Sequence, residues 1–298
     1  MTFDAPMLPP LSCDAHLHVL GPPDRYPGAA ARLYQPLEKG FDEYREVAAR
    51  LGASRAVLVQ PSAYGTDNRA MLDALRAHPG TTRGVVVIDP DICDRDIDEM
   101  HALGVRGVRL NLMSPRIGSP REARALIEPV VRRVGRLGWH LQIYAAPDVI
   151  APIGSVLAGC GVPVVLDHCG GGRASLGVED RDFAAVVDLY ASGACWVKVS
   201  GADIVADQGT STLPVSDDEL APAKAFVSAF VETDASRLVW GSDWPHLFHF
   251  HGAAGDVAPA AIFRRVDESA LARVLQRSAS AADCARILVD NPARLYDF

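Results

Sequence analysis

The chain has 298 residues, 49% of them hydrophobic, and a formal net charge of −8 at pH 7. This length suits one α/β domain with a large core, and the acidic balance argues against a nucleic-acid partner. No stretch approaches the ~18 consecutive apolar residues of a membrane span. The six cysteines form no CxxC pair, as expected of a reduced cytoplasm. We therefore expect a single domain over residues 1–298, cytoplasmic, with neither nucleic acid nor membrane as a partner.

Apolar runs alternate regularly with amphipathic segments along the chain. Short β-branched runs, typical of strands buried on both faces, predict eight strands at 13–19, 55–60, 83–88, 107–112, 140–145, 162–168, 195–200 and 238–243. Apolar residues at helical spacing predict seven helices between them, at 41–51, 67–77, 94–103, 121–137, 148–157, 181–191 and 219–231.

This alternation of strands and helices predicts a (β/α)8 TIM barrel with a C-terminal helical tail. The tail, residues 267–298, is expected to pack a last pair of helices on the barrel wall. A doubly wound open sheet is the competing architecture, and it would leave the first and last strands far apart. Two longer loops, 20–40 and 202–220, each follow a strand and are expected to cover the carboxyl-end mouth of the barrel.

The motif CDAHLHV lies in the first predicted strand and WGSDWPH at the end of the last. In a strand, Asp14, His16 and His18 would point to the same face. A closed barrel would bring Asp243 beside the two histidines. The imidazoles and the carboxylate would then share one pocket that could hold a metal or a water nucleophile. We interpret Asp14 as a residue that orients a histidine or an arginine rather than as a catalyst.

Other candidates end the remaining strands. His168 lies in LDHCGGG, where the glycines allow close backbone approach or only shape the turn. Arg109, within an apolar strand, indicates a buried partner or a substrate carboxylate. Lys198 in VKVSG is similar, and nearby Arg116 could bind substrate or pair with a surface acid.

Three further residues are expected near the mouth of the barrel. Ser62 follows the second predicted strand, and Tyr144 lies near the end of the fifth. Tyr64, in PSAYGTDN, is either a hydrogen-bonding partner of the substrate or a plain turn residue. We keep all three as candidates for substrate binding.

The segments DAHLH, LDHCGG, WGSDWPH and DNPARLY together resemble the amidohydrolase superfamily (amidohydrolase-related family 2), over residues 14–298. The segment VLVQPSAYGTDNRAMLDAL followed by RGVRLNL resembles its lactone-hydrolysing branch, which includes 2-pyrone-4,6-dicarboxylate and sugar-acid lactonases. The resemblance implies that His16, His18 and His168 surround the substrate carbonyl oxygen or a metal. It also implies that Asp243 is the general base for the attacking water.

The same resemblance implies that Arg109, Tyr144 and Arg116 bind carboxylate or hydroxyl groups of the substrate. Tyr144 stands where metal-dependent members usually carry a histidine, and the lactonase branch is known for working without a metal. The segment KVSGADIV also lacks the arginine that the dicarboxylate lactonase has after the seventh strand. We therefore expect no required cofactor. The alternative is one Zn²⁺ or Mn²⁺ held by the three histidines and the aspartate, His16, His18, His168 and Asp243.

The favoured hypothesis is a hydrolase that opens a small, polar, carboxylate-bearing lactone by attack of water activated by Asp243. The alternatives are a metal-dependent hydrolase or decarboxylase, a lactone isomerase on the same barrel, and a binding barrel without turnover. In each case the partner is a small-molecule lactone or carboxylate. A homo-oligomer is compatible with the fold, because barrels are often dimers.

Overall fold

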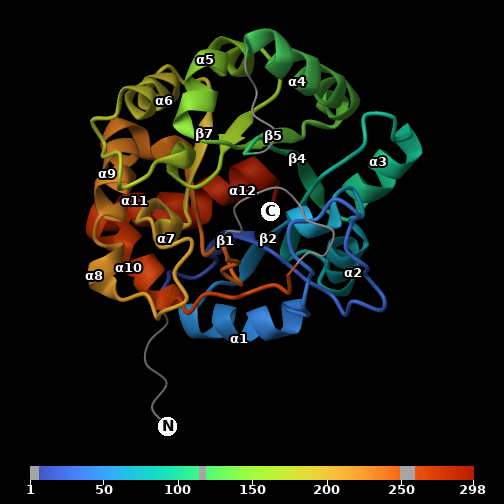
Figure 1. The fold of residues 1–298 in the computed structure, drawn as a ribbon, viewed down its shortest axis with the longest axis horizontal. Coiled ribbons are helices and arrows are strands. Elements are labelled where there is room, and N and C mark those ends of the chain that lie inside the picture. Colours follow the sequence, from blue (N-terminus) through green and yellow to red (C-terminus); the bar gives the residue numbers. More distant parts are fainter. Residues whose placement is uncertain (1–6, 114–118, 249–258) are drawn as a thin grey trace.

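The computed structural model describes residues 7–113, 119–248 and 259–298. Eight parallel strands are hydrogen-bonded in chain order, and helices surround them (Figure 1). The strands are β1 Cys13–Leu17, β2 Arg55–Val59, β3 Thr82–Val86, β4 Val105–Asn111, β5 His140–Tyr144, β6 Val164–Leu166, β7 Trp196–Ser200 and β8 Leu238–Gly241. The predicted TIM barrel is confirmed, although most strands end one or two residues earlier than expected.

Backbone hydrogen bonds join the two ends of the sheet. The backbone N–H of Asp243 donates to the carbonyl of His16 over 2.8 Å, and the N–H of His18 donates to the carbonyl of Trp244 over 2.8 Å. Leu17 and Trp244 form a parallel bridge between these hydrogen bonds. The first and last strands are therefore neighbours, which excludes the open sheet.

The helices lie around the barrel, as Figure 1 shows. They are α1 Phe41–Leu51, α2 Arg69–Ala77, α3 Asp94–Ala102, α4 Pro120–Val134, α5 Pro147–Ala158, α6 Arg181–Ala191, α7 Ala202–Val205, α8 Asp217–Leu220, α9 Ala223–Asp234, α10 Glu268–Ser278, α11 Ala281–Ala285 and α12 Asn291–Tyr296. The prediction of a single helix over 219–231 is wrong at its start, where the structure has the two helices α8 and α9. Pro222 has no N–H for a helical hydrogen bond, and it separates α8 from α9.

The C-terminal tail also differs from the expectation of a helix pair on the barrel wall. At the end of α12, Tyr296 is fully buried against Cys13, Val57 and Val239 inside the barrel. Arg83 of β3 donates from Nε to the carbonyl oxygen of Tyr296 over 3.0 Å. The last helix therefore closes the amino-end floor of the barrel and leaves the carboxyl-end mouth open for a site.

Two smaller expectations can be compared with the structure. All six cysteines have free thiols. In the part of the chain that the structure describes, no helix is long and apolar enough to cross a membrane.

Candidate active site

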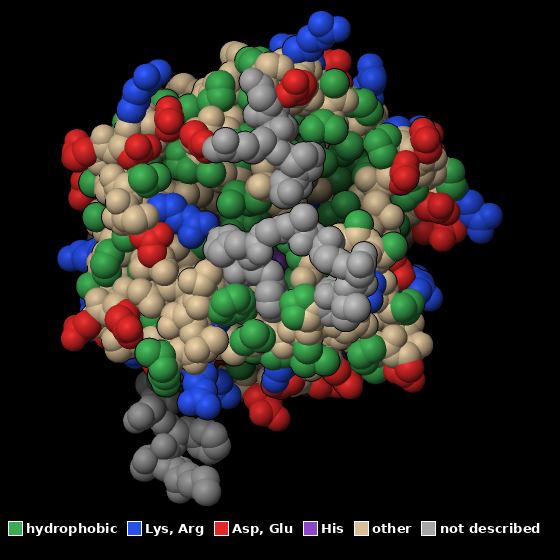
Figure 2. Space-filling model, in the orientation of Figure 1, with side chains coloured by type: hydrophobic (Ala, Val, Ile, Leu, Met, Phe, Trp, Pro, Cys, Tyr) green, Lys and Arg blue, Asp and Glu red, His purple; other side chains and the backbone are tan. Residues whose placement is uncertain are grey.

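The site lies at the carboxyl end of the strands, on the hollowed face in Figure 2. His16 comes from β1, His18 follows β1, His168 follows β6, and Asp243 follows β8. All four side chains are buried. The strand ends therefore bring together residues from both ends of the chain, as the closed barrel required.

The three imidazoles surround one oxygen atom of Asp243. Oδ1 of Asp243 lies 3.6 Å from Nε2 of His16, 3.5 Å from Nε2 of His18 and 3.9 Å from Nε2 of His168. The ring of His16 lies 5.1 Å from that of His18 and 4.8 Å from that of His168, centroid to centroid. All three rings thus present the same nitrogen atom to one small volume.

Asp14 does not share this volume, so the prediction that it faces the same way as the two histidines is wrong. Its carboxylate accepts hydrogen bonds from the hydroxyl of Tyr44 on α1, at 3.1 Å, and from the backbone N–H of Ser242, at 2.9 Å. The pairing register of β1 with β2 shifts between Asp14 and Leu17, which breaks the strict alternation of side chains. Asp14 instead links β1 to the chain after β8, and its role in orienting a histidine or an arginine stays a prediction.

Hydrogen bonding fixes the protonation of one ring. Nδ1 of His18 lies 2.8 Å from the carbonyl oxygen of Val59. A carbonyl can only accept, so Nδ1 carries a hydrogen and Nε2 is the ring nitrogen that faces Asp243. Both ring nitrogens of His16 lack a hydrogen-bond partner within the described residues.

The buried environment sets the charges in the site. Burial lowers the pKa of His16 well below its usual value and also lowers the pKa of His168. Burial alone would raise the pKa of Asp243, but the neighbouring His168, His18 and His16 outweigh it and hold that pKa far below its usual value. Asp243 is therefore ionised at neutral pH, while His16 and His168 favour their neutral forms.

This donor set fits a divalent cation. The ligand atoms of His16, His18 and Asp243 all lie within 4.8 Å of one another, and those of His16, Asp167 and His168 do so as well. Imidazole nitrogens with one carboxylate are ligands that Zn²⁺ accepts. Three of the four residues of the alternative metal hypothesis, His16, His18 and Asp243, thus form one group, whereas His168 groups with His16 and Asp167.

Below the histidines, Asp167 is surrounded by donors. Its carboxylate lies 3.2 Å from Nε of Arg109, 3.0 Å from Nε2 of Gln142 and 4.0 Å from Nζ of Lys198. Its Oδ1 atom lies 3.5 Å from Nδ1 of His16. Burial would raise the pKa of Asp167, but His16, Arg109 and Lys198 hold it well below the usual value.

The predicted role of Lys198 in substrate binding is not supported. The side chain is fully buried, and Nζ donates to the carbonyl oxygen of Ala15 over 2.8 Å. Burial lowers the pKa of this amine to about 8, although Asp167 opposes the shift. Lys198 therefore supports β1 and Asp167 from inside the barrel.

The remaining candidates for substrate binding lie in different surroundings. Ser62 is exposed and hydrogen bonds with Tyr34. Tyr64 turns away from the histidines, because its hydroxyl accepts the backbone N–H of Gly21 over 3.1 Å and its ring packs against Leu20. The turn reading of Tyr64 thus fits better than substrate binding. Arg116 lies outside the described residues.

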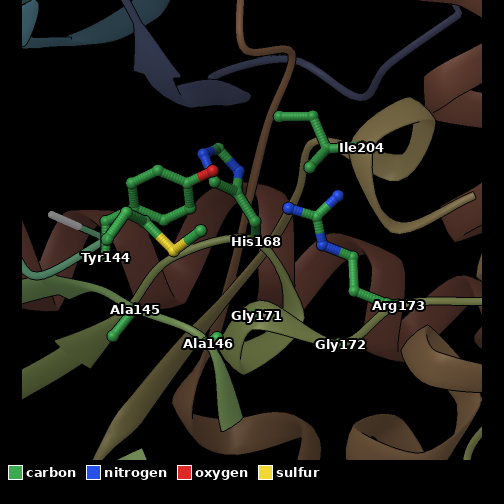
Figure 3. A pocket seen from close by; sticks show the side chains of 9 residues that line it. Tyr144, Ala145, Ala146, His168, Gly171, Gly172, Arg173 and Ile204 are labelled. Atoms are coloured by element: carbon green, nitrogen blue, oxygen red, sulfur yellow. The ribbon is translucent and has the colours of Figure 1, made fainter. Parts of the chain in front are cut away.

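Tyr144 stands beside the histidines. Its ring meets that of His168 edge-on at 5.0 Å, and Cζ of Arg109 lies 5.3 Å from the ring centre. Burial raises the pKa of Tyr144 to about 12, so its hydroxyl remains a neutral donor. The same hollow is lined by Arg173, which sequence reasoning did not single out (Figure 3). The only sequence signal for Arg173 was its place directly after the glycine run of LDHCGGG.

Comparison with known proteins identifies the family of the chain. The amidohydrolase family model matches residues 13–298. A 4-sulfomuconolactone hydrolase of Hydrogenophaga intermedia is 33% identical over 97% of this chain and 90% of its own length. A 2-pyrone-4,6-dicarboxylate hydrolase of Comamonas testosteroni is 31% identical over 97% and 91%. A crystal structure from Pseudomonas putida superposes with a TM-score of 0.76 at 30% identity, covering 97% of this chain and 98% of that one. The chain therefore belongs to the amidohydrolase family.

Proposed function

We propose that this enzyme hydrolyses a small lactone that carries an anionic group, with Asp243 as the base for the attacking water. The observation that carries the proposal is the convergence of three imidazole Nε2 atoms on Oδ1 of Asp243. The related hydrolases named above act on 4-sulfomuconolactone and 2-pyrone-4,6-dicarboxylate. Their names support an anionic lactone as the substrate class.

Asp243 can accept a proton because it is ionised, but its low pKa makes it a weak base. Proton transfer is therefore favourable only if the bound water is made more acidic by its surroundings. A divalent cation held by His16, His18 and Asp243 would supply this by lowering the pKa of water and polarising the carbonyl group. Without one, the N–H groups of His16 and His168 must do this work.

Neutral imidazoles can stabilise the oxyanion that forms at the carbonyl carbon. His16 and His168 favour the neutral form, in which one ring nitrogen keeps a hydrogen to donate. A preorganised donor of this kind is typically worth about 3 kcal/mol in the transition state. The protonated Asp243 is then a strong acid and returns its proton to the ring-opened alkoxide.

Arg109 and Tyr144 are proposed to hold the substrate. The hydroxyl of Tyr144 is a neutral donor beside His168. Arg109 uses Nε for Asp167, and of its two terminal nitrogens Nη1 donates to the carbonyl oxygen of Gln60 over 3.5 Å, which leaves Nη2 for an anion. Its position 5.3 Å from the Tyr144 ring keeps this nitrogen near the site.

The proposal is tested with a panel of lactones, neutral and anionic, with products identified by mass spectrometry. Hydrolysis adds one water to the substrate, whereas isomerisation leaves the mass unchanged. The same assay on protein analysed for bound metal, before and after chelation and with Zn²⁺ or Mn²⁺ restored, tests the cofactor. We expect a product one water heavier than an anionic lactone. Failure of purified protein, with and without added metal, to open any lactone would refute the proposal.

A further inference from the structure

The loop after β6 places a second arginine beside the proposed site. The loop passes through the short 3-10 helix η3 Cys169–Gly171 and Gly172, and then reaches Arg173. Arg173 lines a hollow with His168 and Tyr144, and Figure 3 shows its guanidinium directed into the space next to Ile204. Its side chain is 26% exposed, so the charge is reachable from solvent.

The glycine run before Arg173 allows this approach. Gly171 has a φ of +78°, and a Cβ atom there would lie 2.1 Å from the carbonyl oxygen of Ala145. A Cβ atom on Gly172 would lie 2.5 Å from the ring of Phe226 on α9. Side chains at these positions would push the loop away from the end of β5. The glycines therefore hold Arg173 close to Tyr144 and His168.

The charge of Arg173 is poorly neutralised by the protein. Within the described residues its nearest carboxylate oxygen belongs to Asp207, at 4.0 Å, and Oδ2 of Asp207 already accepts the backbone N–H of Ser175. In contrast, Arg109 donates to Asp167, and Arg264 forms a fully buried ion pair with Asp203. Arg173 thus keeps guanidinium donors free for an outside anion.

We propose that Arg173 is a specificity-determining residue that binds an anionic substituent, carboxylate or sulfonate, of the lactone. This inference rests on the proposed function and names the group that the same site recognises. A guanidinium matches a planar carboxylate or a sulfonate through paired N–H donors.

The space around Arg173 limits where the anion can be. The hollow that it shares with His168 is about 10 Å³, room for one group the size of a water molecule. Beyond it lies a groove of about 360 Å³, whose lining includes Met113, Leu176 and Arg173. Asp148, Asp180 and Asp182 also line this groove and disfavour a second anion farther out. A carboxylate or sulfonate is larger than the hollow, so an anionic group bound by Arg173 would lie where the hollow opens into the groove.

Binding of ligands that cannot be hydrolysed tests this without relying on turnover. Isothermal titration compares isophthalate, benzene-1,3-disulfonate and the neutral isophthalamide on the parent and on Arg173→Gln, Arg173→Lys and Arg181→Gln. Arg181 is an exposed arginine at the start of α6 and serves as the control. We expect Arg173→Gln to weaken the binding of either anion by about 10–100-fold and the binding of isophthalamide by less than twofold. Arg173→Lys should recover part of the loss, and Arg181→Gln should match the parent.

The relative losses for isophthalate and the disulfonate identify which anion the site prefers. Equal losses for isophthalate and isophthalamide, or a parent that does not prefer the anions, would overturn the inference. Once a lactone substrate is identified, Arg173→Gln should raise KM for the anionic lactone by a similar factor and leave KM for its neutral methyl ester unchanged. If no lactone is opened, the proposed function fails, while the titration still reports on Arg173.

Discussion

Two buried polar layers lie one above the other in the barrel, and they differ in how their charges are balanced. In the lower layer, the carboxylate of Asp167 faces Arg109, Lys198 and the amide of Gln142. In the upper layer, the carboxylate of Asp243 faces the imidazoles of His16, His18 and His168. The lower layer has its own cations, whereas the upper one lacks a permanent positive charge.

The difference indicates a division of labour. A balanced buried cluster can hold strands in place, since each charge has a fixed partner. A cluster with an ionised acid and neutral bases can instead bind a proton, a metal or a polarised substrate. His16 belongs to both layers, because Nδ1 faces Asp167 and Nε2 faces Asp243. Substitutions outside His16 can therefore perturb one layer at a time.

The largest effect is expected in the upper layer. Asp243→Asn keeps the shape of the side chain but removes the base, so kcat should fall by about 10³–10⁴-fold. The variant should keep the circular dichroism spectrum of the parent, because its backbone bond to His16 is unchanged. Steady-state kinetics on the best lactone measure the loss. Turnover within tenfold of the parent would show that Asp243 is not the base.

The positive charge of Lys198 in the lower layer also acts on His140, at the start of β5. Burial, assisted by the charge of Lys198, lowers the pKa of His140 to about 3 from 6.5. Between these values the unfolded chain binds the extra proton, so stability falls as the pH drops from 6.5 to 3. The total loss is about 5 kcal/mol. His140→Leu should therefore flatten the pH dependence of the unfolding free energy, measured by urea titration. An unchanged slope in this window would contradict the assignment.

Breaking the lower layer should mainly affect folding. Asp167→Asn leaves Arg109 and Lys198 without their shared carboxylate, and it should cost about 3–4 kcal/mol of unfolding free energy. The pKa of Lys198 should fall further below 8, because Asp167 now raises it. Denaturant unfolding reports the first effect. A loss below 1 kcal/mol would mean that Asp167 is not the centre of this layer.

The smallest effect on stability is expected at the hydrogen bond between Tyr44 on α1 and Asp14 on β1. Tyr44→Phe removes the hydroxyl that donates to Asp14, whose pKa burial raises to about 6. The lost hydrogen bond should cost about 1–2 kcal/mol when Asp14 is ionised. Thermal melts at pH 8 and pH 5 measure it, and the loss should be smaller at pH 5, where more of the acid is protonated. An equal loss at both pH values would assign the effect to packing alone.

The barrel and the central group of the site were predictable from sequence because they depend on regular patterns. Eight apolar runs with helices between them require closure, and closure places Asp243 beside His16 and His18. The predicted face of Asp14 was wrong because the β1–β2 register shift depends on the neighbouring strand, which a two-residue period cannot reveal. The predicted helix over 219–231 ran through Pro222, whose missing N–H interrupts the helical hydrogen bonds and separates α8 from α9.

The loop residues were harder to assign, because their directions depend on contacts distant in sequence. Tyr64 is turned by its hydrogen bond to Gly21. Arg173 reaches the site through glycines that pack against Ala145 and Phe226, a contact with α9 that the motif LDHCGGG does not encode. A candidate list built from strand ends therefore includes Tyr64 and Lys198 and omits Arg173.

The hydrogen bonds between His16 and Asp243, and between His18 and Trp244, join the first strand to the last. During synthesis on the ribosome, the segment with the histidines emerges early and must wait for most of the chain before its partner appears. A nascent chain therefore has no assembled base, and activity should begin only after the eighth strand has been released. Two fragments cut in a middle loop should likewise be inert alone and regain turnover only when they reassociate along this seam.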